Sequence, residues 1–283
     1  MNLLTRRSAV LAAIAVTASL ALALPASAAT PASVVPSTTA AAKPTIVLVH
    51  GAWADSSSWA PVTSTLQLAG YTVLAPPNPL RGLTGDAAYL AAYLQQATTG
   101  PVVLVGHSYG GAVITNAALA DPDVKALVYV DAFVPDVGES VGQLVAASTS
   151  ALNVPDPTSI FTIVGYPGAP EGDADAYLKP AAFATLFAQD VPAIVRSPLA
   201  AGQRPITLSA LGTPSATAAW KTLPSWYVIG TEDKVLPPAA QEAMAHRAGS
   251  KITKVKASHL VMISKPLVVA KVIGDAASAI SQH

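Results

Sequence analysis

The most constraining feature of this sequence is a serine set among glycines, between an apolar strand pattern and an alanine-rich helix pattern. Residues 102–119 read VVLVGHSYGGAVITNAAL, with Ser108 between Gly106 and the pair Gly110 and Gly111. A sharp strand-to-helix turn holds its central residue in a strained conformation and tolerates only small neighbours. The stretch therefore predicts a turn that presents the Ser108 hydroxyl at the carboxyl end of a sheet, above the free N–H groups of a helix N-terminus.

Strand and helix patterns alternate around this turn, which indicates a mostly parallel sheet covered by helices on both faces. The predicted strands are 45–50, 71–76, 101–106, 125–133, 225–233 and 251–258. The predicted helices are 57–70, 85–97, 237–249 and 264–282. Asp86 is the expected N-cap of the helix over 85–97. Residues 134–224 interrupt the alternation with many prolines and small residues, and contain one helical pattern at 173–190. We expect this insertion to form a cap over the strand ends.

The N-terminal segment has the pattern of an export signal rather than of the folded domain. Residues 1–28 combine an arginine pair, an apolar run and the small-residue sequence ASA, which predicts a signal peptide cleaved after Ala28. The arginine pair is also compatible with a twin-arginine signal. Residues 29–43 are rich in Ala, Pro, Ser and Thr and predict a flexible linker, leaving 44–283 as the folded domain. We therefore expect a secreted protein without a stable membrane anchor.

Composition narrows the classes of function. The 283 residues carry a formal net charge of +0 and are 52% hydrophobic, so the chain can build a large core and lacks the basic balance of a nucleic-acid-binding protein. Cysteine is absent, which excludes disulfides, thiolate catalysis and cysteine-ligated zinc. The five histidines have no close helical spacing of the kind that binds a metal. We expect neither a cofactor nor a metal, and the oligomeric state stays open.

A serine hydroxyl becomes an effective nucleophile when a neighbouring base removes its proton. His259 occupies a loop at the carboxyl end of a late strand, where it could lean over the sheet towards Ser108. Asp233 ends the strand over 225–233, opens the loop that follows, and is the expected acid that orients the base. Asp131 ends the strand over 125–133 and is a competing acid; its alternative role is to hold the first turn of the cap through backbone N–H groups.

Attack on a carbonyl also requires donors for the oxyanion that forms. Two backbone N–H groups are placed for this role, that of Tyr109, which follows the serine, and that of Ala52 in the loop after the first strand. Because backbone donors do not depend on the side chain, the sequence needs to supply close approach, and Gly51 supplies it.

The chain resembles the α/β-hydrolase superfamily, in particular the compact branch of small bacterial esterases, plant methyl-ester hydrolases and hydroxynitrile lyases. The stretches that carry the resemblance are VLVHGAWADSSSWAPV (47–62), VVLVGHSYGGAVI (102–114), LVYVDAFVPDVGES (127–140), GTEDKVLPPAAQEAMAHRAG (230–249) and SHLVMISKPLVVA (258–270). The resemblance implies an α/β-hydrolase fold with a small cap. It also implies the site roles, which are nucleophile Ser108, base His259, acid Asp233, and oxyanion donors Ala52 and Tyr109.

This branch contains two reaction classes, and two positions separate them. The similar lyases carry threonine where Gly51 stands and lysine where Leu260 stands, so the polar groups that hold a cyanohydrin and cyanide are missing here. We therefore expect hydrolysis of small, uncharged, partly hydrophobic carboxylic esters through an acyl-enzyme. The alternatives are a lyase-like or cofactor-free haloperoxidase-like activity and a non-catalytic binding protein, although binding proteins on this fold usually lose a residue of the triad.

Overall fold

The central sheet is built from the apolar, β-branched runs that the sequence pattern marks as strands. In the computed structural model, which describes residues 43–281, six parallel strands lie in the order β2-β1-β3-β4-β8-β9. The strands are β1 (Thr45–Val49), β2 (Val73–Leu74), β3 (Val102–His107), β4 (Val124–Val130), β8 (Ser225–Gly230) and β9 (Lys251–Val255). This arrangement confirms the predicted α/β class and the parallel sheet.

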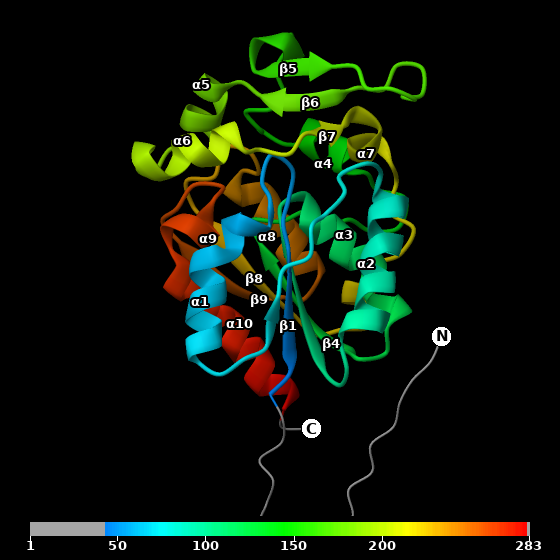
Figure 1. Cartoon of the computed structure of the whole chain (residues 1–283), viewed down its shortest axis with the longest axis vertical. Helices are drawn as coiled ribbons and strands as arrows, with labels where there is room; N and C mark the ends of the chain where they lie inside the picture. Colours follow the sequence, from blue (N-terminus) through cyan, green and yellow to red (C-terminus); the bar gives the residue numbers. More distant parts are fainter. Residues whose placement is uncertain (1–42, 282–283) are drawn as a thin grey trace, which may run out of the picture. The chain divides into compact units, whose positions relative to one another are not determined.

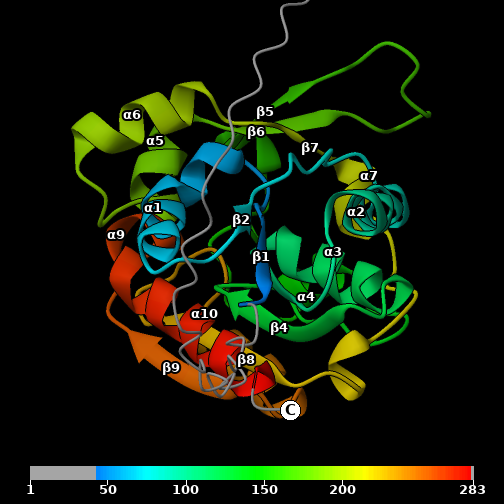
Figure 2. The same cartoon turned by 60° about the horizontal axis from the view of Figure 1, so that its bottom comes forward.

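Helices cover both faces of this sheet, as Figures 1 and 2 show. The helices α1 (Ala60–Leu68) and α10 (Pro266–Ile280) pack side by side on one face. The helices α2 (Leu83–Ala97) and α3 (Tyr109–Ala117) pack together on the opposite face, and α8 (Pro238–Arg247) packs against β8. Shorter helical turns are η1 (Ser56–Trp59), η2 (Ala118–Ala120) and α9 (Val261–Ser264).

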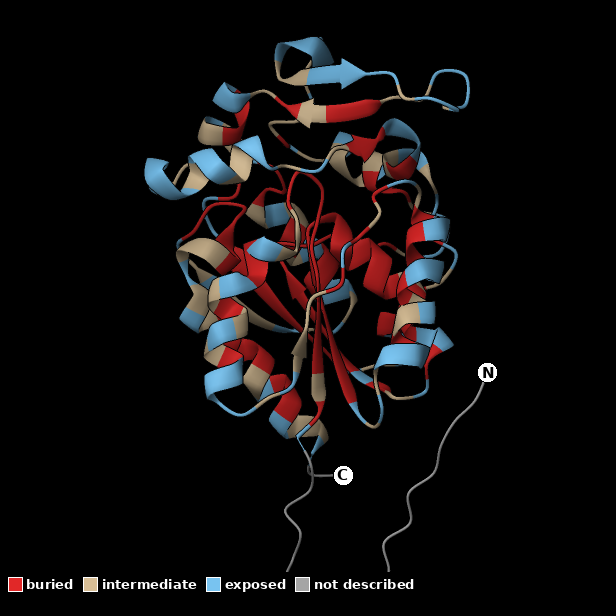
Figure 3. Cartoon of the chain, viewed as in Figure 1, coloured by how far each residue is buried: buried red, intermediate tan, exposed pale blue. Residues whose placement is uncertain are grey.

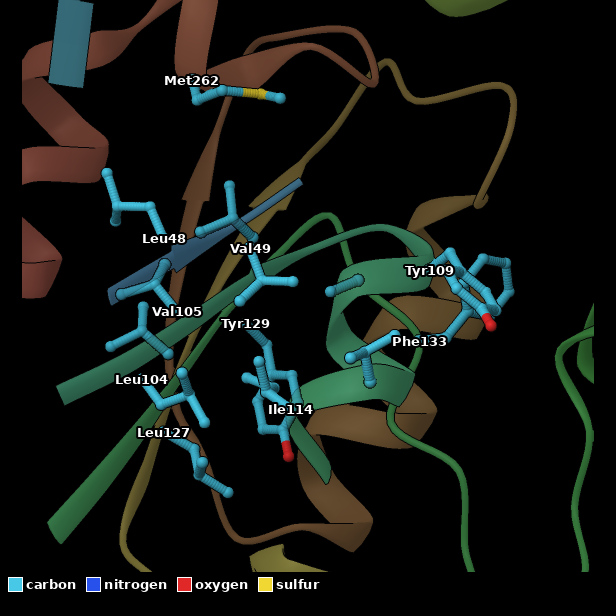
Figure 4. Close-up of a cluster of buried hydrophobic side chains, with 14 of the residues drawn as sticks. Leu48, Val49, Leu104, Val105, Tyr109, Ile114, Leu127, Tyr129, Phe133 and Met262 are labelled. Atoms are coloured by element: carbon cyan, nitrogen blue, oxygen red, sulfur yellow. The ribbon is translucent and has the colours of Figure 1, made fainter. Parts of the chain in front are cut away.

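The core lies along β3 and β4, in the middle of the sheet. Every residue of β3 is buried, and Figure 4 shows Leu104, Val105 and Leu127 from these strands among the clustered side chains, with Ile114 of α3 beside Tyr129. Each fully buried Leu, Val or Ile side chain stabilises the fold by about 1.5–3 kcal/mol. Burial on both faces explains why these strands are continuous apolar runs.

The insertion between β4 and β8 forms a separate layer above the carboxyl ends of the strands (Figure 1). It contains a small antiparallel sheet in the order β5-β6-β7, made of Phe161–Val164, Asp175–Leu178 and Ile206–Thr207. Its helices are α4 (Val141–Ala146), η3 (Pro157–Ser159), α5 (Pro180–Ala182), η4 (Phe183–Phe187), α6 (Ala193–Ala201), α7 (Leu208–Gly212) and η5 (Ala219–Lys221). Its outer strand β5 is largely solvent-exposed (Figure 3).

The predicted helix over 173–190 is wrong in its first half. Residues Asp175–Leu178 form β6, which pairs antiparallel with β5. The reason is Pro180, whose ring disfavours a helical conformation at the preceding residue; Lys179 accordingly has an extended backbone with ψ of 145°. Helical structure begins at Pro180 and continues as a π-helical turn over Phe183–Phe187.

The expected cap of α2 is also different. The helix begins at Leu83, with Gly82 in the N-cap position, and Asp86 lies in the first turn. The Asp86 carboxylate reaches back to accept a hydrogen bond from the Arg81 N–H at 3.1 Å and another from the Tyr109 hydroxyl at 2.8 Å. Asp86 therefore joins the start of α2 to the start of α3, beside the Ser108 turn.

The predicted signal peptide lies outside the described residues, as does nearly all of the predicted linker. None of the helices within residues 43–281 has the length and apolar character that a membrane span requires.

Candidate active site

The site is organised by the turn between β3 and α3. The strand ends at His107 and the helix begins at Tyr109, so Ser108 alone makes the change of direction. Its backbone has φ of 53° and ψ of −126°, in a region that residues with a side chain rarely adopt. This conformation lifts the serine side chain out of the strand at the carboxyl edge of the sheet.

Close backbone packing holds the turn in place. A Cβ atom on Gly106 would lie 2.5 Å from the carbonyl oxygen of Gly110, and one on Gly110 would lie 2.5 Å from the carbonyl oxygen of Val49. A Cβ on Gly111 would likewise meet the Phe133 carbonyl oxygen at 2.5 Å. The glycines around the serine are therefore required by contact between strand, helix and neighbouring loops.

The structure brings the three expected triad side chains into one hydrogen-bonded line. His259 Nε2 lies 2.8 Å from Ser108 Oγ, and His259 Nδ1 lies 2.7 Å from Asp233 Oδ2. All three residues are buried. With Nδ1 protonated and facing the carboxylate, Nε2 is the free acceptor that faces the serine hydroxyl.

The Asp233 carboxylate lies in a turn after β8 and is held by several donors. Its Oδ1 accepts hydrogen bonds from the Val235 and Leu236 N–H groups at 2.8 and 2.9 Å. Its Oδ2 accepts one from Gln241 Nε2 at 2.9 Å, in addition to the His259 bond. The strand ends at Gly230, so Asp233 follows three residues later instead of ending the strand.

Asp131, the competing acid, lies near Asp233 and His259 but forms no hydrogen bond with Ser108 or His259. Its Oδ1 accepts from the Gly230 N–H at 2.6 Å, and its side chain is fully buried. The expected alternative role at the first turn of the cap is therefore wrong, because the carboxyl group is bonded to the end of β8. Like Ser108, Asp131 has a positive φ, of 44°.

Of the other histidines within the described residues, His50 and His107 are buried and hydrogen-bonded to neighbouring backbone groups. His50 Nε2 accepts from the Asn78 N–H at 2.9 Å, and burial lowers the pKa of His50 to about 4. His107 Nε2 donates to the His259 carbonyl oxygen at 2.8 Å, and burial holds the pKa of His107 well below its ordinary value. His246 is exposed on α8. The His107 bond was not anticipated from sequence, and it holds the backbone that carries the His259 imidazole.

The two expected oxyanion donors lie next to Ser108. A Cβ on Gly51 would lie 2.6 Å from Ser108 Cβ, so the loop after β1 passes directly against the serine. Within residues 43–281, the N–H groups of Ala52 and Tyr109 donate no intramolecular hydrogen bond, and both residues line the same cavity as Ser108. These two free N–H groups, one of them at the N-terminus of α3, can stabilise a developing negative charge.

The cavity at Ser108 is small and almost entirely apolar. Its volume is about 110 Å³. The walls come from both layers, with Phe133 at the sheet edge and Val141, Val145, Leu152, Phe161 and Leu211 from the cap. A second cavity of about 280 Å³ lies beside it and is lined by Leu260 and Phe187. Trp53 lines both cavities.

The cap also contacts the loops that carry the triad, a feature that sequence patterns did not reveal. The Asp190 carboxylate accepts hydrogen bonds from the N–H and hydroxyl of Ser258, the residue before His259. Gln189 Nε2 donates to the Glu232 carbonyl oxygen at 2.7 Å, next to Asp233. These contacts join one segment of the cap to both loops.

By distance alone, one buried group within the described part of the chain could hold a metal ion. Ligand atoms of Asp131, Asp233 and His259 lie within 4.8 Å of one another. Both ring nitrogens of His259 already face triad partners, which leaves the imidazole no free nitrogen for a metal. The arrangement fits a hydrogen-bonded triad better than a metal centre.

A strand-to-helix turn that presents a serine on a parallel sheet, with a histidine and an acid on later loops, is typical of the α/β-hydrolase class. Residues 46–272 match the model of the alpha/beta hydrolase family, and the chain belongs to this family. This membership confirms the resemblance seen in the sequence.

Several proteins to which this chain is similar are esterases or hydrolases by name. A carbendazim hydrolyzing esterase of Nocardioides is 38% identical over 107 residues, which are 34% of this chain and 44% of that relative. A pyrethroid hydrolase of Sphingobium wenxiniae is 26% identical over 254 residues, covering 84% of this chain and 89% of the relative. The crystal structure of polyneuridine aldehyde esterase superposes with a TM-score of 0.71 at 23% identity, covering 83% of this chain and 99% of the other.

Proposed function

We propose that this protein is a serine hydrolase that cleaves carboxylic esters through an acyl-enzyme intermediate. The observation that carries the proposal is the line from Ser108 through His259 to Asp233, with two free N–H donors and an apolar cavity at the serine. Membership of the alpha/beta hydrolase family and the esterase and hydrolase names of relatives support the same reaction class.

The proposed reaction has two halves. His259 Nε2 takes the Ser108 proton as Oγ attacks the ester carbonyl, and the N–H groups of Ala52 and Tyr109 stabilise the oxyanion. The protonated histidine, held by the Asp233 carboxylate, then gives its proton to the departing alcohol. In the second half, His259 activates a water that attacks the acyl carbonyl, and the serine leaves as the acid is released.

The cavity indicates the substrate class. Ser108 supplies the hydroxyl, while the cap residues in the wall are apolar, so a charged acyl group would lose its hydration without gaining a partner. A volume of about 110 Å³ favours a small acyl group. The proposal is therefore a small, uncharged, partly hydrophobic ester.

The geometry gives no support to a cyanohydrin lyase. A threonine at position 51 would place its Cβ 2.6 Å from Ser108 Cβ, so the local backbone leaves no space for the lyase hydroxyl without moving. Leu260 is buried and lines the neighbouring cavity, where it offers no charge to a departing cyanide.

The N-terminal pattern supports a secreted location for this enzyme. The proposal predicts that secreted material begins at Ala29, which N-terminal sequencing would establish. Membrane-bound protein that begins at Met1 would contradict it.

The decisive experiment is an assay of the purified mature protein on p-nitrophenyl esters of increasing acyl length, combined with labelling by a serine-directed phosphonate. We expect hydrolysis that is fastest for short acyl groups, one labelled site at Ser108, and no release of cyanide from mandelonitrile above background. Labelling at another residue, or rapid cyanide release without ester hydrolysis, would contradict the proposed function.

A further inference from the structure

The side chain of Gln241 connects the triad to a second buried acid. Gln241 lies on α8 and is fully buried. Its Nε2 donates to Asp233 Oδ2 at 2.9 Å and to the Leu236 carbonyl oxygen at 2.7 Å. These two acceptors use both hydrogens of the amide nitrogen, and exchanging the nitrogen and oxygen positions would place Oε1 against two acceptors. The orientation of the amide is therefore determined by its neighbours.

This orientation leaves two buried oxygen atoms without a donor. Gln241 Oε1 and Asp131 Oδ2 are both shielded from solvent and have no hydrogen-bond partner among the described residues. The Gln241 amide lies close to the Asp131 carboxyl group, where a hydrogen bond from an amide N–H would lower the pKa of that carboxyl. Both amide hydrogens are already donated to Asp233 Oδ2 and the Leu236 carbonyl oxygen, so Oε1 is the polar atom of Gln241 that remains for Asp131. Two acceptors cannot satisfy one another, and each unsatisfied buried polar atom is costly. A single hydrogen between them would satisfy both.

We propose that Asp131 is protonated in the folded protein and donates its Oδ2–H to Gln241 Oε1. The hydrogen-bonded line of the proposed triad then continues from Asp233 through the Gln241 amide to Asp131. This inference rests on the proposed function for its catalytic meaning, although the protonation itself does not depend on it. Asp131 and Gln241 are positioning residues, because neither contacts Ser108 or the cavity.

The charges around Asp131 agree with this assignment. The titratable groups that face it are Asp233 after β8, Asp190 of the cap, Tyr227 of β8 and His259. None of them carries a positive charge while the imidazole is neutral. Burial, together with the adjacent Asp233 carboxylate, raises the pKa of Asp131 well above its ordinary value.

The two acids are distinguished by their donors. Asp233 receives two backbone N–H groups, the Gln241 amide and the imidazole, whereas Asp131 receives one backbone N–H group, from Gly230. Ligand atoms of the two carboxyl groups lie within 4.8 Å of each other. Two buried carboxyl groups at this separation do not both ionise, and the one with more hydrogen-bond donors keeps the negative charge. A neutral Asp131 therefore leaves the negative charge on Asp233, where it orients and stabilises the imidazolium.

The first test is the pH dependence of stability in Asp131→Asn, which needs no enzymatic activity. The asparagine Nδ2 can donate to Gln241 Oε1 while its Oδ1 accepts from the Gly230 N–H, so the variant keeps the proposed hydrogen bonds. Folded wild type holds a proton that the unfolded chain releases near a pKa of about 3.9. Its stability therefore falls as pH rises towards the raised folded pKa, and the variant does not share this loss.

Urea unfolding of both proteins from about pH 5 to about pH 8 measures this effect. We expect the unfolding equilibrium constant of wild type to rise relative to the variant by up to about tenfold per pH unit. A ratio that stays constant with pH would mean an ionised Asp131 and would overturn the proposal. Stability that depends on added Ca²⁺ or on a chelator would overturn it as well, because a cation would then satisfy the two oxygens.

The second test concerns the positioning role. Asp131→Asn should keep kcat within about threefold of wild type, whereas Asp131→Leu leaves Gln241 Oε1 without a donor and should lower kcat by about tenfold. In Asp131→Leu, the Gln241 amide loses its partner at Oε1 and donates a weaker hydrogen bond to Asp233. The Asp233 carboxylate then stabilises the imidazolium form of His259 more strongly. The acid limb of kcat/KM should therefore move to higher pH in this variant. A loss of kcat in Asp131→Asn as large as in Asp233→Asn would overturn the proposal. A wild type that hydrolyses no ester contradicts the proposed function, and the unfolding experiment still decides the protonation of Asp131.

Discussion

The edge of the parallel sheet and the cap meet around one cavity, but the two regions differ in how tightly each is packed. At the sheet edge, β3 is buried throughout and Gly106 has no space for a Cβ, because the Gly110 carbonyl oxygen would lie 2.5 Å away. In the cap, β5 is largely exposed, and a Cβ on Gly165 would meet no atom within 4 Å. The sheet edge therefore supplies a rigid frame for chemistry, while the cap supplies a wall that tolerates change.

Several hydrogen bonds connect the two regions near the site, among them that of the Ser150 hydroxyl to the Val235 carbonyl oxygen at 2.6 Å. Trp53 Nε1 donates to the Ala176 carbonyl oxygen of β6 at 2.9 Å, and Asp190 accepts from Ser258 beside His259. The ion pair of Arg81 with Asp175 adds one further link, with the arginine about half exposed. We expect changes at the sheet edge to affect the rate of the chemical step or the stability of the fold. Changes in the cap should mainly affect the choice of substrate.

The largest expected effect is at Ser108. Ser108→Ala should reduce kcat for a p-nitrophenyl ester by about 10⁶-fold, since the nucleophile is removed. The melting temperature should stay close to that of wild type, because one hydroxyl is lost without a change in packing. Substantial activity in a folded Ser108→Ala protein would show that the chemistry does not belong to the sheet edge.

A loss of about 10⁴-fold in kcat is expected for Asp233→Asn, because an amide at this position favours the wrong tautomer of His259. The matched control is Asp131→Asn, which changes the neighbouring buried acid by the same atoms and should retain most activity. Steady-state kinetics of the two variants at one pH make the comparison. The reverse order of activities would move the triad acid to Asp131.

Glycine substitutions compare the two regions by stability. Gly106→Ala should lower the free energy of unfolding by about 1–3 kcal/mol or more, because the new methyl group meets backbone atoms that cannot move independently. Gly165→Ala introduces the same methyl group in the cap, into open space. Its effect should lie within about 0.5 kcal/mol. Equal losses of stability in urea unfolding would remove the proposed difference in rigidity.

The smallest expected effect is a change in kcat/KM for long-chain esters when a cap residue in the cavity wall is replaced. Val145→Phe reduces the cavity at Ser108, so kcat/KM should fall about tenfold for a long-chain acyl ester and remain nearly unchanged for the acetate. Leu144→Phe is the control, since Leu144 lies next to it on α4 but lines a different cavity. Assays of both variants across the acyl series would test this assignment. An identical loss for every ester in Val145→Phe would argue that the cap supports the chemistry itself.

Sequence reasoning succeeded where local pattern and fold agree and failed where distant residues decide. The strands and the Ser108 turn follow from continuous apolar runs and from glycines at close contacts, and both are features of neighbouring residues. The helix predicted over 173–190 failed because β6 obtains its backbone partners from β5, and because Pro180 interrupts the pattern. Gln241 offered no signal at all, since its importance comes from a carboxylate on another loop.

The sequence by itself determined the class of fold, the position of the Ser108 turn and a short set of candidate acids and bases. A parallel sheet gathers the carboxyl ends of its strands at one edge, so Ser108, Asp233 and His259 could be expected to meet there. The tertiary structure decided which acid is the partner of His259. Both acids are buried near the imidazole, but Asp233 bonds to it and Asp131 bonds to the Gly230 N–H. The difference lies in the surrounding donors, which come from residues 230–241 and from the loop of His259, and can be counted only after these segments have packed together.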